Sequence, residues 1–169
     1  LLFFLGLLTA FVVCSQDEKI DSLESLLQKE GDVANKVLLI DQLTNLYKSE
    51  KEAELYVKSA LDLSQKSDYI SKCVAYNNAF DFYFTLREYD DAIFFKRKEF
   101  ALWQTENDEN KFGECHYDLG YSFMKKYVLD SAIVHFKKAD TFFTESNDWK
   151  NVVTTRNRLG IIEKDFGNF

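Results

Sequence analysis

The sequence contains no proline and only six glycines in 169 residues. Sheet proteins need many such breakers at their turns, so this scarcity argues against a sheet and favours helices joined by short turns. Aromatic residues are abundant instead, with 16 Phe, 9 Tyr and 2 Trp. Together with a hydrophobic fraction of 46%, they suffice for one substantial core or one stack of helical repeats.

Positive charge is also in short supply. The 21 basic residues are outnumbered by 28 acidic ones, and the formal net charge is −7. Non-specific binding to nucleic acid depends on clustered Lys and Arg, which displace counterions from the phosphates. We therefore expect no nucleic-acid partner for this region.

Motifs for catalysis are missing as well. The two histidines, His116 and His135, lack the spacing of metal ligands, and we find no glycine-rich phosphate loop and no nucleophile motif. We therefore expect no catalytic residue, no cofactor and no metal site in this chain.

The N-terminal stretch, residues 1–14, carries no charged side chain. It is too short to span a bilayer as a helix, which takes about 20 residues. It is typical of the apolar part of a secretory signal peptide, with Val13 and Ser15 preceding a cleavage site at Gln16. Because the charged start of such a peptide is missing, we expect residues 1–15 to be an incomplete signal peptide and the sequence to be a fragment of an exported protein, in the periplasm or cell envelope. The alternative is a lipid anchor at Cys14.

A repeat of 40 residues runs through the rest of the sequence. Asp68, Asp108 and Asp148 are spaced by 40 and 40, and each follows a Ser or Asn where a helix is expected to begin. The same register relates three further pairs, namely Asp90 and Asp130, Ala92 and Ala132, and Leu119-Gly120 and Leu159-Gly160.

One unit carries the pattern of a helical hairpin in Leu119, Gly120, Phe123, Ala132 and Phe136. The pattern resembles that of the tetratricopeptide repeat (TPR) family, and the resemblance covers roughly residues 33–169. It implies an all-α solenoid of antiparallel helix pairs in a right-handed superhelix. In such pairs the small residues permit close approach and the aromatic residues fill the space between helices. The expected packing residues are Ala92, Leu119, Gly120, Phe123, Ala132, Phe136, Ala139, Leu159 and Gly160.

The repeats divide the chain into a capping helix at 16–32 and about 3.5 repeats at 33–67, 68–107, 108–147 and, in part, 148–169. We expect helices near residues 17–30, 33–49, 51–66, 69–87, 90–106, 109–127, 130–146 and 149–166. Because the partial repeat has no second helix, we also expect an exposed apolar strip on Leu159, Ile162 and Phe166.

The unit at 68–107 departs from the family pattern. Phe80, Lys96 and Glu99 stand where a Gly, an aromatic residue and an Ala are expected. We expect the second helix of this unit to rotate, so that its apolar residues face inward instead: Phe95, Phe100 and Leu102.

Cys73 and Cys115 lie 42 residues apart, two positions out of the 40-residue register. A disulfide needs Cα atoms within about 7 Å, whereas neighbouring helix axes already lie about 8–10 Å apart. We expect both thiols to be free.

The resemblance also implies a binding groove on the concave side of the array, along the first helix of each pair. The family's groove positions include Asn77, Asp81, Phe84, Tyr117, Tyr121, Lys125 and Asn157. Tyr117, Tyr121 and Lys125 are spaced by four and four, which places them on one stripe of one helix. We expect this stripe to be the centre of a groove for a peptide. The alternative is an ordinary solvated helix face.

Exported arrays of this kind resemble the periplasmic TPR segments of bacterial membrane-anchored sensor kinases and regulators. The resemblance implies a non-catalytic module that binds a protein or peptide and serves as the sensory or scaffolding part of a signal-transduction protein. A transmembrane segment and a histidine kinase region beyond residue 169 are compatible with this interpretation. The alternative is a free or lipid-anchored periplasmic adaptor in envelope assembly.

Overall fold

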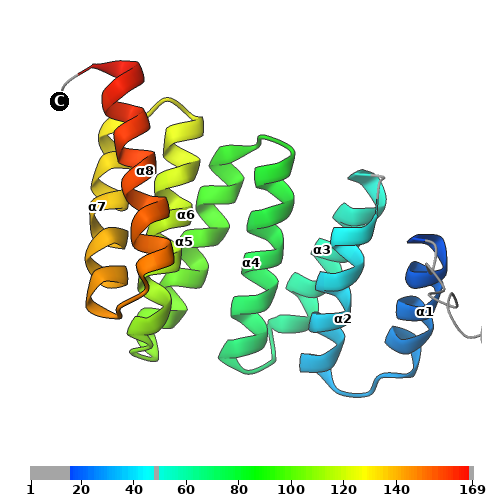
Figure 1. Ribbon diagram of the computed structural model, residues 1–169. Coiled ribbons are helices and arrows are strands. Elements are labelled where there is room, and N and C mark those ends of the chain that lie inside the picture. Colours follow the sequence, from blue (N-terminus) through cyan, green and yellow to red (C-terminus); the bar gives the residue numbers. More distant parts are fainter. Residues whose placement is uncertain (1–15, 48–49, 168–169) are drawn as a thin grey trace, which may run out of the picture.

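The computed structural model describes residues 16–47 and 50–167 (Figure 1). The predicted signal peptide, with Cys14, lies outside these residues. The described residues form α helices and one short 3₁₀ turn, and no strand. The helices are α1 (Gln16–Lys29), α2 (Val33–Leu46), α3 (Glu50–Ser64), α4 (Tyr69–Thr85), α5 (Tyr89–Thr105), α6 (Phe112–Lys125), α7 (Leu129–Glu145) and α8 (Trp149–Phe166), and the 3₁₀ turn η1 spans Glu109–Lys111. None of these helices is long and apolar enough to cross a membrane.

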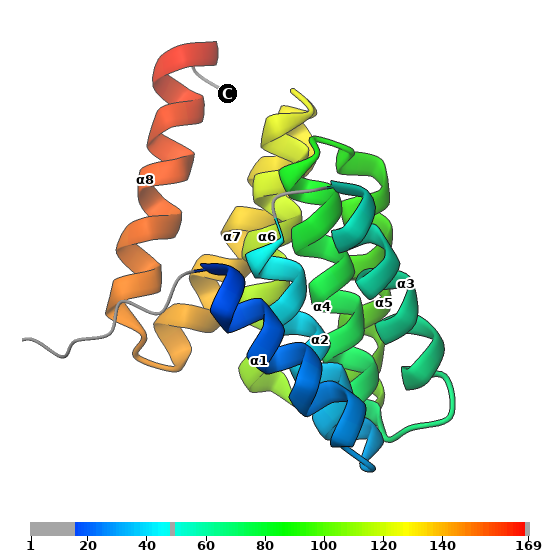
Figure 2. The ribbon, with the colours of Figure 1, turned by 90° about the vertical axis from the view of Figure 1, so that its right-hand side faces the viewer.

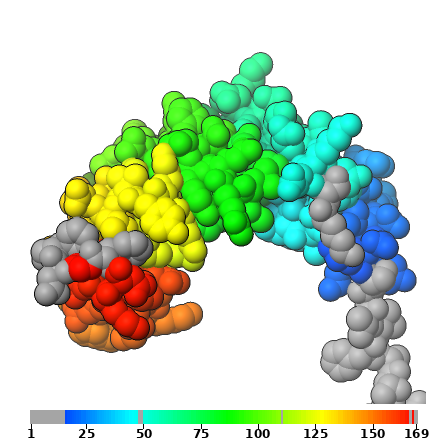
Figure 3. Space-filling view, turned by 90° about the horizontal axis from the view of Figure 1, so that it is seen from above, coloured from blue at the N-terminus to red at the C-terminus, as the bar shows by residue number. Residues whose placement is uncertain are grey.

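The helices stack as antiparallel hairpins, α2 with α3, α4 with α5, and α6 with α7, and each helix packs mainly on its neighbours in sequence. Two views at right angles show the hairpins following one another from α1 to α8 (Figures 1 and 2). Seen from above, the stack bends into an arch with α1 and α8 at its two ends (Figure 3). Helices α2, α4 and α6 face the hollow of the arch, whereas α3 and α5 lie on its outer side. The predicted all-α helical-hairpin solenoid is confirmed.

The four turns between α4 and α8 contain neither proline nor glycine. Each of four turns has one non-glycine residue in the left-handed region, at intervals of 20 residues: Arg87 (φ 66°), Asn107 (φ 55°), Tyr127 (φ 61°) and Asn147 (φ 59°). The next residue donates its N–H to a carbonyl five positions back, as Val128 does to Phe123 at 2.9 Å. This arrangement satisfies carbonyl groups that the helix end leaves free.

The repeated aspartates differ in what they cap. Asp68 accepts from the backbone N–H of Ser71 at 2.8 Å, and Asp148 accepts from that of Asn151 at 3.2 Å. The side chain of Asp108 makes no such cap bond, and the residues after it form η1 before α6 begins at Phe112. The predicted helix start at residue 109 is therefore wrong by three residues, because the chain first makes a tighter 3₁₀ turn.

Most of the predicted packing residues lie in the core. Ala92, Leu119, Ala132, Phe136 and Ala139 are buried, and Phe123 packs against the cluster around Phe136. A Cβ atom on Gly120 would lie 2.9 Å from Cδ1 of Phe136, so the absent side chain is what permits this close approach of α6 and α7.

The last helix corrects two predictions. A Cβ atom on Gly160 would meet nothing within 4 Å, so Gly160 has no packing role among the described residues. The reason is that no described helix covers this side of α8, as α7 covers Gly120 of α6. Ile162, expected on an exposed strip, is fully buried against Ala132 and Phe136. Leu159 is half-buried in the same cluster, and the side chain of Phe166 lies outside the description.

Both cysteines of the described residues are free and buried, as predicted. Cys73 of α4 and Cys115 of α6 pack with Trp103 of α5 in one apolar cluster. Burial raises the pKa of both thiols, that of Cys73 to about 12. The two residues therefore behave as small apolar side chains.

Candidate functional site

The predicted groove residues lie on the first helices of three successive units. Asn77, Asp81 and Phe84 are on α4, Tyr117, Tyr121 and Lys125 on α6, and Asn157 on α8. Because residues three or four apart share a helix face, the residues on α4 form one stripe along their helix, and so do those on α6. Spacing along one helix determines which of these side chains share a face, while their contacts with one another come from the packing of α4, α6 and α8.

An aromatic row joins α4 to α6. The rings of Phe84 and Tyr121 stack with centroids 5.3 Å apart, and the rings of Tyr121 and Tyr117 stack at 6.3 Å. All three side chains are half-buried. Tyr89 of α5 adds an edge contact to Phe84 at 5.4 Å. The row thus presents apolar ring surface together with tyrosine hydroxyl groups, a combination favoured at protein interfaces.

Two cations meet at this row. The guanidinium of Arg158 on α8 lies 4.7 Å from the ring centroid of Tyr121, and its Nε donates to the hydroxyl of Tyr117 at 3.2 Å. The Nζ of Lys125 lies 5.2 Å from the same Tyr121 centroid. Neither cation forms an ion pair with a carboxylate in the part of the chain that the structure describes. Their charges are therefore available to an anionic group of a ligand.

Sequence reasoning missed Arg158. The signal was present, because Asn78, Asp118 and Arg158 are spaced by 40 and 40, so Arg158 occupies a position that also carries a polar residue in the two preceding units. The predicted residue Asn157 is exposed, and it lines a shallow hollow on α8 together with Arg158.

The α4 side of the row is acidic. Asp81 is exposed, yet the protein around it displaces part of its hydration, which raises its pKa to about 6. Lys96 opposes this shift, whereas Asp118 and Asp41 add to it. Asn77 is engaged at both ends of its amide, since Nδ2 donates to Asp81 at 3.1 Å and Oδ1 accepts from Lys96 at 2.6 Å. Asn77 thus positions Asp81.

Beside the row, a charged network occupies the core of the second unit. Lys96 is only 2% exposed, and its Nζ lies 2.7 Å from Glu99, 2.9 Å from Asp118 and 4.2 Å from the ring centroid of Phe80. Glu99 in turn accepts from Trp103 at 3.1 Å. Burial alone would lower the pKa of Lys96, but the two carboxylates raise it above its ordinary value.

This network overturns the expected rotation of α5. Lys96 and Glu99 hold the inward positions, and the residues expected to replace them are only half-buried: Phe95, Phe100 and Leu102. The physical reason is that Asn77, Glu99 and Asp118 supply an acceptor for each donor of the ammonium group, which makes its burial tolerable.

The two histidines meet across α6 and α7. Nδ1 of His116 lies 3.0 Å from Nδ1 of His135, among the rings of Phe100, Phe142 and Phe123. Burial lowers the pKa of His116 to about 4 and also lowers that of His135. No third His, Cys, Asp or Glu joins them as a possible metal ligand within the described ranges. The two imidazoles are neutral and form a hydrogen bond with each other. Their sequence separation of 19 residues did not predict this contact.

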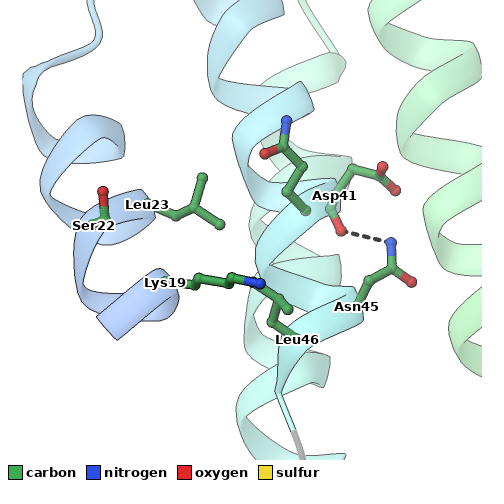
Figure 4. A pocket seen from close by; sticks show the side chains of 7 residues that line it. Lys19, Ser22, Leu23, Asp41, Asn45 and Leu46 are labelled. Carbon is green, nitrogen blue, oxygen red and sulfur yellow. Dashed lines mark hydrogen bonds between the residues drawn. The ribbon is translucent and has the colours of Figure 1, made fainter. Parts of the chain in front are cut away.

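A separate hollow of about 550 Å³ lies at the other end of the arch, between α1 and α2 (Figure 4). Its lining residues are Lys19, Ser22, Leu23, Asp41, Gln42, Asn45 and Leu46. Asp41 forms hydrogen bonds within the protein, because Oδ1 accepts from Asn78 at 3.0 Å and its backbone carbonyl accepts from Asn45 at 2.9 Å. The pocket between α1 and α2 is lined by one cation, Lys19, and not by a pair of cations such as Lys125 and Arg158.

Comparison with known proteins supports the fold alone. The sequence matches no model of a known protein family and no curated protein. The crystal structure of BtubC (BKLC) from P. vanneervenii is similar, with a TM-score of 0.73 and 17% sequence identity. The similarity covers 89% of this chain and 64% of that one, so this chain spans less than two thirds of its length. At this identity, the likeness establishes that both chains share a stacked helical architecture.

Proposed function

We propose that this chain is a non-catalytic, tetratricopeptide-type module that binds a peptide segment of a partner protein in the hollow of the arch. The observation that carries the proposal is the aromatic row of Phe84, Tyr121 and Tyr117 with two cations beside it. Rigid tyrosine rings offer a large contact area at little cost in conformational entropy, and Tyr and Arg are enriched among residues that dominate binding energy.

The charges beside the row favour one direction of the peptide. Asp81 lies on α4, whereas Arg158 lies on α8 and Lys125 of α6 lies with Arg158 at the ring of Tyr121. A peptide with a basic residue over Asp81 and an acidic residue over Lys125 and Arg158 would be complementary to both charges. Such complementarity acts mainly on the choice of partner and the rate of association.

The wider role that we propose is the sensory or scaffolding part of an exported signal-transduction protein. Its support is the resemblance of the 40-residue repeats and the apolar N-terminal stretch to the periplasmic segments of membrane-anchored regulators. A binding module without catalytic residues is what such a role requires.

The experiment is affinity capture from an envelope extract, followed by measurement of Kd for each captured protein. Tyr117→Ala and Tyr121→Ala should each weaken binding by about 1–2 kcal/mol, which is roughly five- to thirtyfold, without loss of helicity. Trp149→Ala is the matched control, because Trp149 is an exposed aromatic residue at the start of α8 and outside the row. Equal capture by the parent and by the double tyrosine variant would refute the proposed groove.

A further inference from the structure

A pocket of about 500 Å³ lies between the C-terminal ends of α2 and α4, beside the start of α3. The two helices pack directly on each other, so the pocket is part of the fold and not a gap between separate units. Asp81, one of the predicted groove residues, lines it and lies one turn before Phe84 on α4. The pocket therefore adjoins the aromatic row.

The lining of this pocket combines an apolar and a polar part. Ala53 and Phe82 are buried and Leu86 is half-buried, so these three side chains offer an apolar wall. The other part includes the exposed side chains of Asn45 and Asp81. A ligand group that fills the pocket must therefore be apolar along one stretch and polar at one end.

Asp81 has no cation of its own. Its Oδ2 accepts from Nδ2 of Asn77 at 3.1 Å, and no basic side chain of the described residues forms an ion pair with it. Lys96 attracts it, but the three N–H groups of that ammonium are already used by Asn77 at 2.6 Å, Glu99 at 2.7 Å and Asp118 at 2.9 Å. Burial accordingly raises the pKa of Asp81 to about 6, as expected for a carboxylate whose charge is not balanced.

Two neutral oxygen atoms in the lining add acceptor capacity. Nδ2 of Asn45 donates to the carbonyl of Asp41 at 2.9 Å, whereas its Oδ1, which lies on the side away from α1 in Figure 4, accepts no hydrogen bond from the residues that the structure describes. Oγ1 of Thr85 donates to the carbonyl of Asp81 at 2.8 Å and keeps its lone pairs free to accept. Acceptors thus come from both α2 and α4, and a group that only donates would suit them.

The charges of the lining favour a cation as well. Glu50 and Asp81 are acidic, and Arg87, in the turn after α4, is the one basic residue among the described lining residues. Arg87 is exposed, so solvent screens its repulsion of a second cation. An uncharged apolar group would remove water from Asp81 without balancing its charge, which is costly.

We propose that the pocket between α2 and α4 receives the side chain of an arginine or lysine from the bound peptide, with Asp81 as its counter-ion. The aliphatic stem of such a side chain lies on the apolar wall, and its charged head donates to the acceptors at the polar end. The proposal rests on the proposed function for the peptide that carries this side chain, and it specifies that peptide further. A basic residue must lie close to the residue that contacts the aromatic row.

The first experiment uses a probe that does not need the aromatic row. N-acetyl-arginine methylamide and its lysine analogue carry the proposed stem and head, and N-acetyl-glutamine methylamide is the uncharged control. In a titration of the isotope-labelled protein, both cationic compounds should shift the amide signals of Asp81 and Thr85 saturably, with a Kd of roughly 1 mM. The glutamine compound should bind about tenfold more weakly.

Two variants should change this binding in opposite directions. Asp81→Asn removes the counter-ion at nearly constant volume and should weaken binding of both cationic compounds about tenfold or more. Arg87→Gln removes the repelling charge and should strengthen it about two- to fivefold. Asp165→Asn is the matched control, because it removes an exposed carboxylate on α8. Equal binding of the arginine and glutamine compounds, or equal binding by the parent and Asp81→Asn, would overturn the proposal and leave the proposed groove untouched.

A second experiment tests whether the cation belongs to a peptide. Synthetic peptides with an arginine and a tyrosine separated by one, two or three glycines can reach Asp81 and the aromatic row together. At least one of them should bind about tenfold more tightly than the arginine compound, because its two contacts act as one binding event. Tyr121→Ala should remove this gain and leave binding of the arginine compound unchanged. If no spacing gives a gain, the pocket serves a free small cation and the peptide source is wrong. A gain that survives Tyr121→Ala would refute the proposed aromatic contact and not the pocket.

Discussion

The ammonium group of Lys96 lies 2.9 Å from a carboxylate oxygen of Asp118, and this ion pair ties α5 to α6. Lys96 is buried, whereas Asp118 is partly open to solvent. With Glu99 on the same helix as Lys96, the pair forms a group of three charges close to the aromatic row. Such a buried group stabilises the fold only while all its members are present.

Removal of the positive charge should therefore be costly. In Lys96→Met, Glu99 is left buried without its cation, and we expect a loss of about 3–5 kcal/mol in the free energy of unfolding, measured by urea denaturation. Lys58→Met is the control, because Lys58 pairs with Glu54 on the surface at 2.6 Å, where solvent screens the pair and the expected loss is much smaller. Equal losses in the two variants would contradict the structural role of Lys96.

Gly120 and Gly160 occupy equivalent repeat positions and should respond in opposite ways to alanine. Gly120→Ala places a Cβ atom 2.9 Å from Cδ1 of Phe136, and we expect a loss of about 1–3 kcal/mol. Gly160→Ala meets no described atom within 4 Å, and the better helix propensity of alanine should stabilise α8 by about 0.5–1 kcal/mol. Thermal unfolding of both variants separates these effects. A loss in Gly160→Ala would mean that this side of α8 is covered.

The histidine pair should make stability depend on pH. The pKa of His116 is about 4 in the folded protein and near 6.5 in the unfolded chain. Its contribution to the free energy of unfolding is therefore complete above about pH 6.5 and is lost as the pH falls toward 4. The loss from this residue is of the order of 3 kcal/mol. The raised pKa of Asp81 acts in the opposite sense, because protonation near pH 6 relieves the cost of its charge.

The two effects are separated by comparing variants at each pH. His116→Phe removes the histidine titration, so its stability relative to the parent should rise between pH 6.5 and 4 in urea denaturation. Asp81→Asn removes the opposing effect, and its advantage over the parent at pH 7 should shrink as the pH falls below 6. A constant difference between His116→Phe and the parent over this range would show that His116 titrates normally.

Thiol chemistry tests the burial of the cysteines. A chain that begins at Gln16 should show two reactive thiols after unfolding without reductant, because Cys73 and Cys115 are free. In the native protein both should react with a thiol reagent much more slowly, since both are buried and their pKa values are raised. Fast labelling of the native protein would indicate that the α4–α5–α6 packing opens readily.

Much of the architecture is encoded locally. Hydrophobic spacing and the 40-residue register place the helices within a few residues of their observed bounds, because helix formation and capping depend on residues at most four or five positions apart. Asn107 and Asn147 mark two of the turns for the same reason, since asparagine tolerates the left-handed conformation. The stripe of Tyr117, Tyr121 and Lys125 also follows from spacing within one helix.

The contacts between helices were decided only by the tertiary structure. The same Leu-Gly pair occurs in α6 and α8, yet within the described part of the chain a helix packs against Gly120 and none against Gly160. Lys96 is buried because acceptors on α4, α5 and α6 converge on it, and Arg158 joins the site because α8 places it against Tyr117 and Tyr121. Spacing along one helix determines which side chains share a face. What that face contacts depends on helices many residues away in the sequence. The same distant helices decide whether a charged side chain is buried, contacts a ligand or faces solvent.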